Sequence, residues 1–516
     1  MAVLAAAFAD IMERHAERTA LGDPDHLLTY RQLDGLAAEA AEVLAAHRGP
    51  GGTVRAGIQA PNSTAYVVVY LAMLRLGIVP FLVDAVLGPD EVASIADQCS
   101  LDLLVHEADR GPAEGTAEAD LGGILGLRVA ALRRTERRYP LRADTEVCRF
   151  TSGSTGHPNC IEFSGTAVAQ AAANWAVGSG LRPDDRIACF AALSNGLAFN
   201  TSLLAAFRTG ASLHLTRGLP TGAHIARMLA RTEATWLVGF PALYESVVRR
   251  ALDRAAFGRI RIAISSGAPL RPQTRAEFAA LTGVRISNYY GVAETGPLTF
   301  DPRPDADADR SGSLGTLLPG VALRAGTAGG EGESGPDGTV NGTGGGGGDG
   351  TVDGTGDTAA EPAEIRVRSE SMGSGYLNAP SVFEARIDAE GYYRTGDQGL
   401  LRDRELFLTG RTSRMINFGG RKVDPLEVGN VLRLLPAVRD AVVFEVTDRH
   451  GSPAVAAAIV AEPGLGVPAL RAHCQASLAD YKVPGFFHLV DEIPANAIGK
   501  PSLDRLRRLV TADVST

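Results

Sequence analysis

The feature that most constrains the fold of this chain is a repeated alternation of strand and helix patterns over its first 320 residues. Residues 64–76 form an apolar helical pattern that Asn62 and Ser63 can cap, and residues 78–83 follow as a continuous apolar strand. Strands that alternate with helices are typical of α/β layers. We therefore predict an α/β fold with a large, multi-layer N-terminal domain of sheets and helices.

Three polar or glycine-rich turns follow apolar strands of this pattern. The strand at 146–150 leads into TSGSTGHPN at 151–159. The segment 259–269 runs from a strand into SSGAP, and 284–296 runs from a strand into NYYGVAETG. In open α/β sheets, ligands bind beyond the carboxyl ends of the strands. The three turns together predict one shared ligand site.

The first of these turns has the composition of a phosphate-binding loop. Its first six residues hold four hydroxyl side chains and two glycines: Thr151, Ser152, Gly153, Ser154, Thr155 and Gly156. Hydroxyls and backbone N–H groups can wrap a phosphate. The common phosphate loop places a lysine after its last glycine, whereas Asn159 stands near that position here. The loop therefore predicts a phosphate ligand whose neutralising cation comes from elsewhere in the chain.

Lysine is scarce in this chain. Of the 50 basic residues only Lys422, Lys482 and Lys500 are lysines, and the others are arginines. A retained lysine can supply a compact ammonium charge, which a planar guanidinium does not. The alternative is that the three are ordinary surface lysines.

Bulk composition excludes several classes of protein. The 516 residues exceed one domain, and the net charge of −9 comes from interspersed acids and bases, so we expect no nucleic-acid or membrane partner. The first 20 residues read as a helix, and not as a signal peptide, while residues 64–76 are too short to span a bilayer. Five scattered cysteines predict buried, reduced thiols in a cytoplasmic protein.

Two later segments differ in kind from the rest. Residues 325–362 consist mostly of Gly, Thr, Asp, Glu and Ala, so we predict a disordered insertion that acts as a spacer. Residues 411–516 combine strand patterns at 441–446 and 454–460 with a helical pattern at 470–478. This end of the chain is predicted to be a small α+β unit.

Seven motifs occur in the order of a known superfamily. They are TSGSTGHP (151–158), SSGAP (265–269), NYYGVAETG (288–296), GSLGTLLPG (312–320), YRTGD (393–397), GRTSRMINFGGRKVDPLEV (410–428) and GK (499–500). The chain thus resembles the adenylate-forming (AMP-binding) superfamily of acyl-CoA synthetases, aryl-acid ligases and nonribosomal adenylation domains. The resemblance implies a large N-terminal domain at 1–410 and a small mobile α+β C-terminal domain at 411–516.

The resemblance also implies the chemistry. A carboxylate attacks the α-phosphorus of MgATP to give an acyl-adenylate, and a thiol then takes the acyl group. Lys500 would be catalytic, bridging the carboxylate and the α-phosphate, and Glu294 would hold Mg²⁺. The implied ATP and AMP site consists of Thr151 to Gly156, Gly267, Ala268, Pro269, Asn288, Tyr289, Tyr290, Gly291, Asp397 and Arg411. Either Tyr289 or Tyr290 would stack on adenine, while Asp397 and Arg411 would bind the ribose.

The remaining implied positions concern the acid, the thiol and the hinge between the domains. Ser194, Asn195 and Asn200 fall in the acyl pocket, Gly419 and Gly420 in the thiol tunnel, and Ser413 at the hinge. Amino-acid-activating members carry an aspartate where Asn200 stands, so this resemblance predicts an acid without an α-amino group. An aryl or bulky cyclic acid is expected first and medium-chain fatty acids second. Alternatively, Asn200 is offset by one residue and only caps a helix.

The chain departs from the superfamily pattern at Asn159 and Cys160, at Ala293 and at Ser194. These departures remove a charge and a hydroxyl near the triphosphate and leave three readings open. The first is a ligase that loads coenzyme A or the phosphopantetheine of a carrier protein. The second is an adenylate former that passes its product to a partner ligase. The third is a nucleotide-binding pseudoenzyme.

Overall fold

The structure is a computed structural model of the chain. It describes residues 3–514 apart from 48–52, 109–117, 122–125, 133–137, 152–157, 218–220, 251, 253, 268–269, 303–311, 328–329, 335–339, 343–360, 403–404, 412–415, 419–420, 424, 448–452, 479 and 496–500. Within these residues no helix is both long enough and apolar enough to cross a bilayer.

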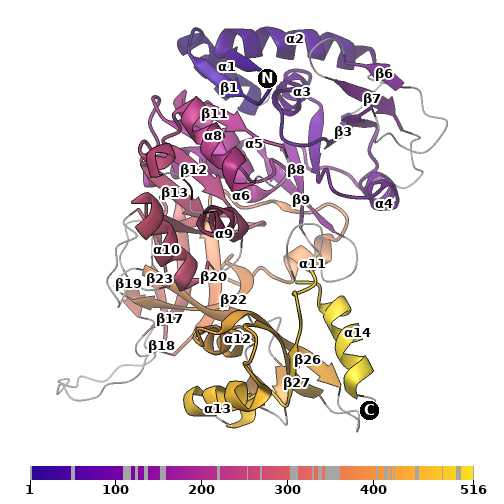
Figure 1. The fold of residues 1–516 in the computed structure, drawn as a ribbon. Helices are drawn as coiled ribbons and strands as arrows, with labels where there is room; N and C mark the ends of the chain where they lie inside the picture. The colour runs from indigo at the N-terminus through magenta and orange to yellow at the C-terminus, as the bar shows by residue number, and fades with distance from the viewer. Residues whose placement is uncertain are drawn as a thin grey trace, which may run out of the picture.

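An eight-stranded sheet forms the upper part of the molecule in Figure 1. In spatial order its strands are β21 (Gly375–Tyr376), β9 (Asn159–Ser164), β8 (Thr145–Thr151), β4 (Val79–Val83), β3 (Arg55–Gln59), β5 (Leu103–Glu107), β7 (Leu127–Ala131) and β6 (Glu118–Asp120). Strands β3, β4, β5 and β8 are paired in parallel, as alternating strands and helices predict. The helices of this part are α2 (Tyr30–Ala46), α3 (Thr64–Arg75) and α4 (Pro89–Cys99).

A second, fifteen-stranded sheet occupies the middle of the molecule. One half of it is largely parallel and contains β14 (Ile286–Val292), β13 (Ile262–Ser265), β12 (Trp236–Gly239), β10 (Arg186–Cys189), β11 (Ser212–Leu215), β1 (Thr19–Gly22) and β2 (Leu27–Thr29). The other half is largely antiparallel and contains β15 (Gly296–Phe300), β16 (Ser313–Leu317), β23 (Glu405–Arg411), β22 (Tyr393–Arg402), β20 (Ala363–Ser369), β17 (Val321–Thr327), β18 (Gly330–Ser334) and β19 (Val340–Gly342).

The remaining helices of the two large sheets are α1 (Val3–Arg14), α5 (Gly165–Ser179), α6 (Gly196–Ala198), the π-helix η2 (Phe199–Leu204), α7 (Ala205–Thr209), α8 (Gly222–Thr232), α9 (Pro241–Arg249), the 3₁₀-helix η3 (Arg254–Phe257), α10 (Pro272–Thr282) and α11 (Pro380–Glu384). Helix α1 begins on a distant carboxylate, because the N–H groups of Val3 and Leu4 donate to Glu146 of β8 at 2.6 and 2.9 Å. A carboxylate at a helix N-terminus satisfies donors that have no partner inside the helix.

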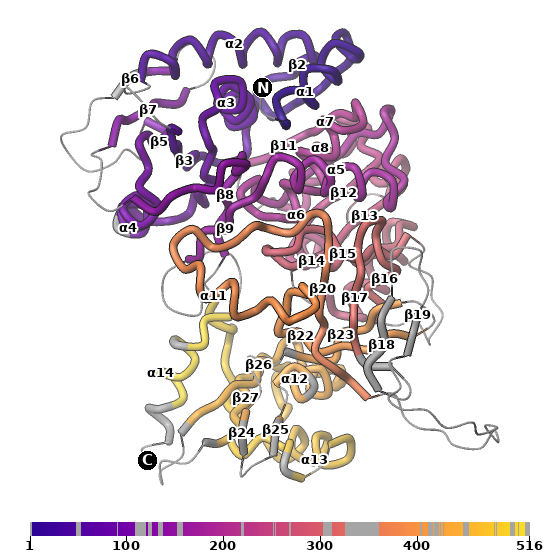
Figure 2. Tube along the Cα trace, turned by 180° about the vertical axis from the view of Figure 1, so that it is seen from behind, coloured from indigo at the N-terminus to yellow at the C-terminus, as the bar shows by residue number. Residues whose placement is uncertain are grey.

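The end of the chain forms a smaller body at the bottom of Figure 1, and Figure 2 shows the same separation from behind. Its elements are β24 (Ile416–Phe418), β25 (Arg421–Val423), α12 (Pro425–Arg433), β26 (Val438–Thr447), β27 (Pro453–Ala461), α13 (Val467–Ser477), η6 (Asp480–Lys482), β28 (Phe486–Leu489) and α14 (Leu503–Val514). Strands β26, β27 and β28 form a sheet of their own, with apolar clusters around Ile459 and Leu506. The α/β fold with a large and a small part is therefore confirmed.

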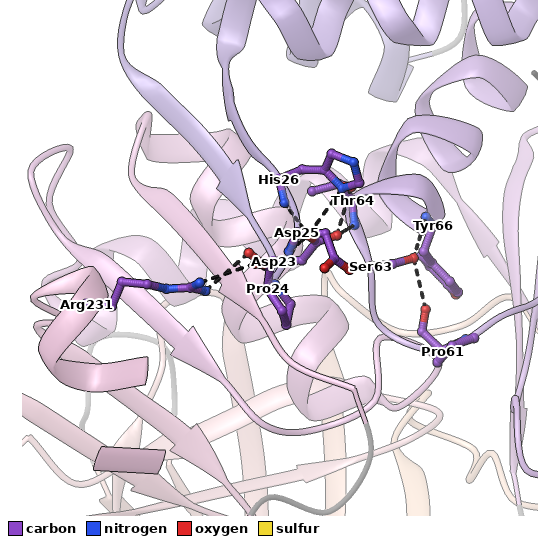
Figure 3. A network of polar contacts seen from close by, with 9 residues as sticks. All are labelled: Asp23, Pro24, Asp25, His26, Pro61, Ser63, Thr64, Tyr66 and Arg231. Atoms are coloured by element: carbon purple, nitrogen blue, oxygen red, sulfur yellow. Dashed lines mark hydrogen bonds and ion pairs between the residues drawn. The ribbon is translucent and has the colours of Figure 1, made fainter. Parts of the chain in front are cut away.

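Asp23 links the two large sheets (Figure 3). It follows β1 and accepts hydrogen bonds from the backbone N–H and hydroxyl of Thr64, at the start of α3, at 2.8 and 2.9 Å. The N–H groups of Asp25 and His26 also donate to it, at 2.9 and 2.8 Å. Arg231 of α8 donates to the Asp23 carbonyl at 3.2 Å. Burial opposes ionisation of Asp23, but these hydrogen bonds outweigh it and lower its pKa.

Several predicted elements are confirmed. Ser63 caps α3, Gly77 follows that helix with a φ of +65°, and all five cysteines are buried free thiols. Most of the segment 325–362, which is predicted to be disordered, lies outside the described residues, including 343–360, but its first part contains strands. Strand β17 extends to Thr327, and β18 and β19 continue the sheet edge. Strand pairing uses backbone groups that every residue here carries, so a segment without apolar side chains can still extend an edge.

Candidate functional site

Several of the predicted site residues lie at or just beyond the carboxyl ends of β8, β13 and β14. Thr151 is the last residue of β8 and pairs with Asn159 of β9. Gly267 lies two residues beyond β13, and Glu294 lies two residues beyond β14. Strand ends are where a parallel sheet offers unpaired backbone groups and loops to a ligand.

Glu294 is held by a tyrosine from a distant segment. It is 8% exposed, and the Tyr376 hydroxyl donates to its Oε1. Tyr376 in turn lies 3.3 Å from the hydroxyl of Tyr393, the first residue of YRTGD. Burial raises the pKa of Tyr376 and of Tyr393 above the ordinary range, and the nearby Glu294 charge raises both further. Both phenols therefore stay protonated and able to donate.

The donor set at Glu294 fits a magnesium ion bound together with a nucleotide. Mg²⁺ in such sites takes one or two carboxylates and fills its other positions with phosphate and water oxygens. Tyr376 engages Oε1, whereas Oε2 has no hydrogen-bond partner among the described residues. Glu294 thus presents one carboxylate oxygen for a hard cation.

Asp397 and Tyr290 form a second buried pair. Asp397 is 1% exposed, and the Tyr290 hydroxyl donates to its Oδ2 at 2.7 Å. Asp397 lies opposite Arg411 in the antiparallel pairing of β22 and β23, so the chain places the two predicted ribose-binding positions side by side. The hydrogen bond between Tyr290 and Asp397 links β14 to the YRTGD segment.

The neighbouring predicted residues of β14 are anchored in the sheet. Tyr289 packs edge-on against Trp175 with ring centroids 5.2 Å apart. The Asn288 side chain accepts from Arg275 and donates to the Ser313 carbonyl, both at 2.6 Å. Asn288 therefore positions the strand, and its side chain is committed to protein partners.

Two glycines near this site are closely packed against their neighbours. Gly267 has a φ of +81°, and a Cβ added there would lie 2.9 Å from the Phe240 ring. A Cβ at Gly291 would lie 2.6 Å from the Tyr289 hydroxyl oxygen and 2.7 Å from the Gly296 carbonyl oxygen. Neither position accommodates a side chain without movement of its neighbours.

The predicted acyl-pocket helix contains a π-helical stretch. Asn200 is the second residue of η2 and is 4% exposed. The helix cap is Asn195, whose side chain accepts from the N–H of Leu197 at 2.9 Å. The alternative that Asn200 only caps a helix is therefore wrong. Single π-helical turns inside α-helices are frequent at functional sites. Ser194 is half-buried just before this helix.

Sequence reasoning missed Arg149, a buried arginine in β8. It is 4% exposed, and its Nη2 donates to the Ala293 carbonyl at 2.9 Å. Its guanidinium carbon lies 4.5 Å from the ring centroid of Phe163 and 5.5 Å from that of Phe199. The available signal was an arginine between the apolar residues of the strand that leads into the predicted phosphate loop.

The other predicted site residues cannot be placed in this geometry. They lie outside the described residues and comprise Ser152, Gly153, Ser154, Thr155, Gly156, Ala268, Pro269, Ser413, Gly419, Gly420 and Lys500. The side chain of Arg411 is likewise undescribed, although its backbone belongs to β23.

Two family models match this chain. Residues 8–342 match the model described as "AMP-binding enzyme", and residues 427–500 match "AMP-binding enzyme C-terminal domain". The first match alone covers more than half of the chain and includes Thr151, Glu294 and the segment between them.

Curated relatives match over almost the whole length. A 3-[(3aS,4S,7aS)-7a-methyl-1,5-dioxo-octahydro-1H-inden-4-yl]propanoyl:CoA ligase of Mycobacterium tuberculosis is 27% identical, with 98% of each chain covered. A 3-hydroxybenzoate–CoA ligase of Aromatoleum is 25% identical, with 96% of this chain and 94% of the relative covered. A salicylyl-CoA synthase / salicylate adenylyltransferase of Streptomyces is 29% identical, with 96% and 92% covered.

Solved structures share the fold. ATP-bound MatB from Rhodopseudomonas palustris matches with a TM-score of 0.80 and 22% identity, and each chain is covered completely. The o-succinylbenzoate CoA synthetase of Bacillus subtilis in complex with its acyl-adenylate matches with a TM-score of 0.78 and 22% identity, covering 98% of this chain and 97% of that one.

Proposed function

Because this chain belongs to the AMP-binding enzyme family, we propose that it activates a carboxylic acid with ATP and transfers the acyl group to coenzyme A. The chain is an acid–thiol ligase of the acyl-CoA synthetase type. The observation that carries the proposal is the presence of two buried carboxylates, Glu294 held by Tyr376 and Asp397 held by Tyr290, a residue of β14. One carboxylate suits a cation at the phosphates, and the other suits the hydroxyls of a ribose.

The roles of individual residues follow from this chemistry. Phosphoryl-group chemistry requires that negative charge be neutralised and that the reactants be aligned. Glu294 would hold Mg²⁺, which neutralises phosphate charge. Thr151 and the loop to Gly156 would hold the outer phosphates. Asp397 would accept hydrogen bonds from the ribose hydroxyls, and Arg411 would donate to the ribose. Lys500 would orient the acid against the α-phosphorus.

The preferred acid is an aryl or bulky cyclic acid without an α-amino group. Asn200 lies buried in the predicted acyl-pocket helix, and its amide cannot neutralise an ammonium. Relatives that act on hydroxybenzoate, salicylate and a bicyclic propanoate support this choice. Coenzyme A is the proposed acceptor because those relatives are CoA ligases, and carrier-protein phosphopantetheine is the other acceptor to test.

Two further parts of the proposal concern organisation. We propose a boundary between the large and small domains at residues 410 and 411. The separate sheet of β26 to β28 and the second family model, which begins at residue 427, support a small C-terminal domain. The supply of ATP and coenzyme A favours action in the cytoplasm.

The test is a panel of acids incubated with the purified chain, ATP and Mg²⁺. Pyrophosphate release should occur with aryl or cyclic acids, and a CoA thioester should form when coenzyme A is added. Lys500→Ala should reduce kcat by about 100-fold with little change in ATP affinity, because its charge acts on the transition state. Lys482→Ala is the matched control and should stay near wild type. Release with amino acids only, or equal losses in both variants, would contradict the proposal.

A further inference from the structure

Arg149 is a buried cation with no carboxylate in direct contact among the described residues. A guanidinium carries five N–H donors. Among the described residues its one hydrogen-bond acceptor is the Ala293 carbonyl, and the nearby charge of Glu294 acts on it from beyond ion-pair distance. The undescribed loop that follows, residues 152–157, contains no aspartate or glutamate.

One other arginine among the described residues is buried to the same degree. Arg55 is 3% exposed, and its guanidinium donates to two backbone carbonyls, those of Cys99 and Tyr139. Arg138 and Arg261, which are about one-third exposed, pair with Asp102 and Asp185. Arg149 has one carbonyl where Arg55 has two, and an incompletely paired buried charge is unfavourable, so its remaining N–H donors suit an anion.

The surroundings of Arg149 locate that anion. A Cβ at Gly196 would lie 2.7 Å from Nη1, so this edge of the guanidinium faces the start of the predicted acyl-pocket helix. One face of the guanidinium is covered by Phe199, the residue before Asn200. The hydrogen bond from Nη2 goes to the carbonyl of Ala293, the residue before Glu294. Arg149 thus lies between the predicted acid pocket and the predicted magnesium carboxylate, and β8 lies beside α6 in both views of the molecule (Figures 1 and 2).

The charge on Arg149 persists at neutral pH. Burial lowers its pKa to about 10, which still leaves the guanidinium protonated. Aromatic rings on the guanidinium stabilise it while leaving its edges, which carry the N–H donors, able to bind an oxyanion.

We propose that Arg149 binds a second anionic group of the acid substrate, a carboxylate or sulfonate, in addition to the carboxylate that reacts with ATP. The inference rests on the proposed function, which already assigns Lys500 to the reacting carboxylate. A planar guanidinium binds an oxyanion through two parallel hydrogen bonds and so selects acids that carry one. The neutral amide of Asn200 can donate to the same or a neighbouring oxygen.

The first experiment compares matched acids in turnover. Benzene-1,3-dicarboxylate and its monomethyl ester have nearly the same shape, as do cyclohexane-1,3-dicarboxylate and its monomethyl ester. Wild-type kcat/KM for pyrophosphate release should be higher for each diacid by about 30-fold or more, because loss of one partner of a buried charge pair has an effect of that size. A wild-type preference for the esters would overturn the proposal by itself.

Variants of Arg149 then assign the preference to this residue. Arg149→Met keeps length and removes charge, and it should erase the diacid preference through KM for the acid while KM for ATP stays unchanged. Arg149→Lys keeps the positive charge and should retain part of the diacid preference. It replaces Arg149→Met in the comparison if the Met variant does not fold. An equal loss on diacids and esters would show a structural role, and a change confined to KM for ATP would assign Arg149 to the nucleotide.

Calorimetric titration of the same diacids without ATP separates the two proposals. Binding to wild type but not to Arg149→Met, with no turnover, would contradict the proposed function and support the anion site. Turnover of monoacids, with neither binding of diacids nor a preference for them, would support the proposed function and contradict the anion site. Absence of both turnover and binding would contradict both.

Discussion

At the scale of single residues, substitutions at Glu294 and Tyr376 distinguish the effect of the carboxylate charge from that of the hydrogen bond that holds it. Glu294→Gln keeps the shape and removes the charge proposed to hold Mg²⁺. We expect kcat for pyrophosphate release to fall by about 100-fold and to recover in part at raised Mg²⁺ concentration. Tyr376→Phe keeps the Glu294 charge and removes the hydrogen bond to Oε1 together with the hydroxyl contact to Tyr393, and it should reduce kcat by about tenfold or less. Initial rates over a Mg²⁺ series measure both, and an unchanged Mg²⁺ dependence in Glu294→Gln would remove the metal role.

Alanine substitutions at two glycines, Gly77 and Gly267, distinguish the cost of backbone strain from the cost of a steric clash. Gly267 and Gly77 both have positive φ, at +81° and +65°, but only Gly267 has a neighbour, Phe240, within 4 Å of an added Cβ. Gly77→Ala should destabilise by about 1 kcal/mol from strain alone, and Gly267→Ala by about 2–3 kcal/mol. Urea unfolding followed by fluorescence gives both values. Equal losses would show that Phe240 moves aside freely.

At the scale of secondary-structure elements, Asp23 fastens α3 to β1 (Figure 3). Asp23→Asn weakens the hydrogen bonds to Thr64 and to the N–H groups that follow β1, so it should reduce the free energy of unfolding at pH 7 by about 1–3 kcal/mol. Asp25→Asn is the control, because Asp25 is exposed, and it should change stability by about 0.5 kcal/mol or less.

The pH dependence of this element follows from the direction of the Asp23 shift. Folding lowers the Asp23 pKa, so ionised Asp23 stabilises the fold above the ordinary pKa of an aspartate, about 3.9. That contribution is lost as pH falls through the lowered value. The difference between wild type and Asp23→Asn should therefore shrink between about pH 5 and pH 2, as measured by urea unfolding at each pH. A constant difference would mean that the Asp23 charge is not the cause.

Elements were predictable from sequence where the signals were local. Ser63 and Gly77 delimit α3 within the helix itself, and apolar runs gave the positions of β4, β8 and β13. Strands β18 and β19 carry no such run, and their backbone pairing with β17 is invisible in composition. The site was predictable as far as motifs reach. No motif joins Tyr376 to Glu294 or Arg149 to Gly196, because contacts between distant segments depend on the packing of the two sheets.

At the scale of the whole molecule, the small C-terminal body has its own sheet and its own apolar clusters. A domain that is proposed to rotate between the two half-reactions needs such a core of its own. Ser413 is the proposed hinge and lies outside the described residues. Hinges absorb backbone rotation, so Ser413→Pro should leave pyrophosphate release within about threefold while reducing thioester formation by about tenfold or more. Ser413→Ala is the control and should spare both steps. Equal losses in the two half-reactions of Ser413→Pro would move the hinge elsewhere.

The capping of α1 by Glu146 also bears on how the chain is made. Synthesis runs from the N-terminus, yet the first helix is anchored on Glu146, and Leu21 of β1 pairs with Leu213 of β11. At ordinary translation rates β11 follows the first thirty residues by roughly ten to forty seconds. Until then α1 can pack only against α2 and α3, and the part of its apolar face, with Leu4, Phe8 and Ile11, that α5 and α7 cover in the finished fold has no partner in the nascent chain.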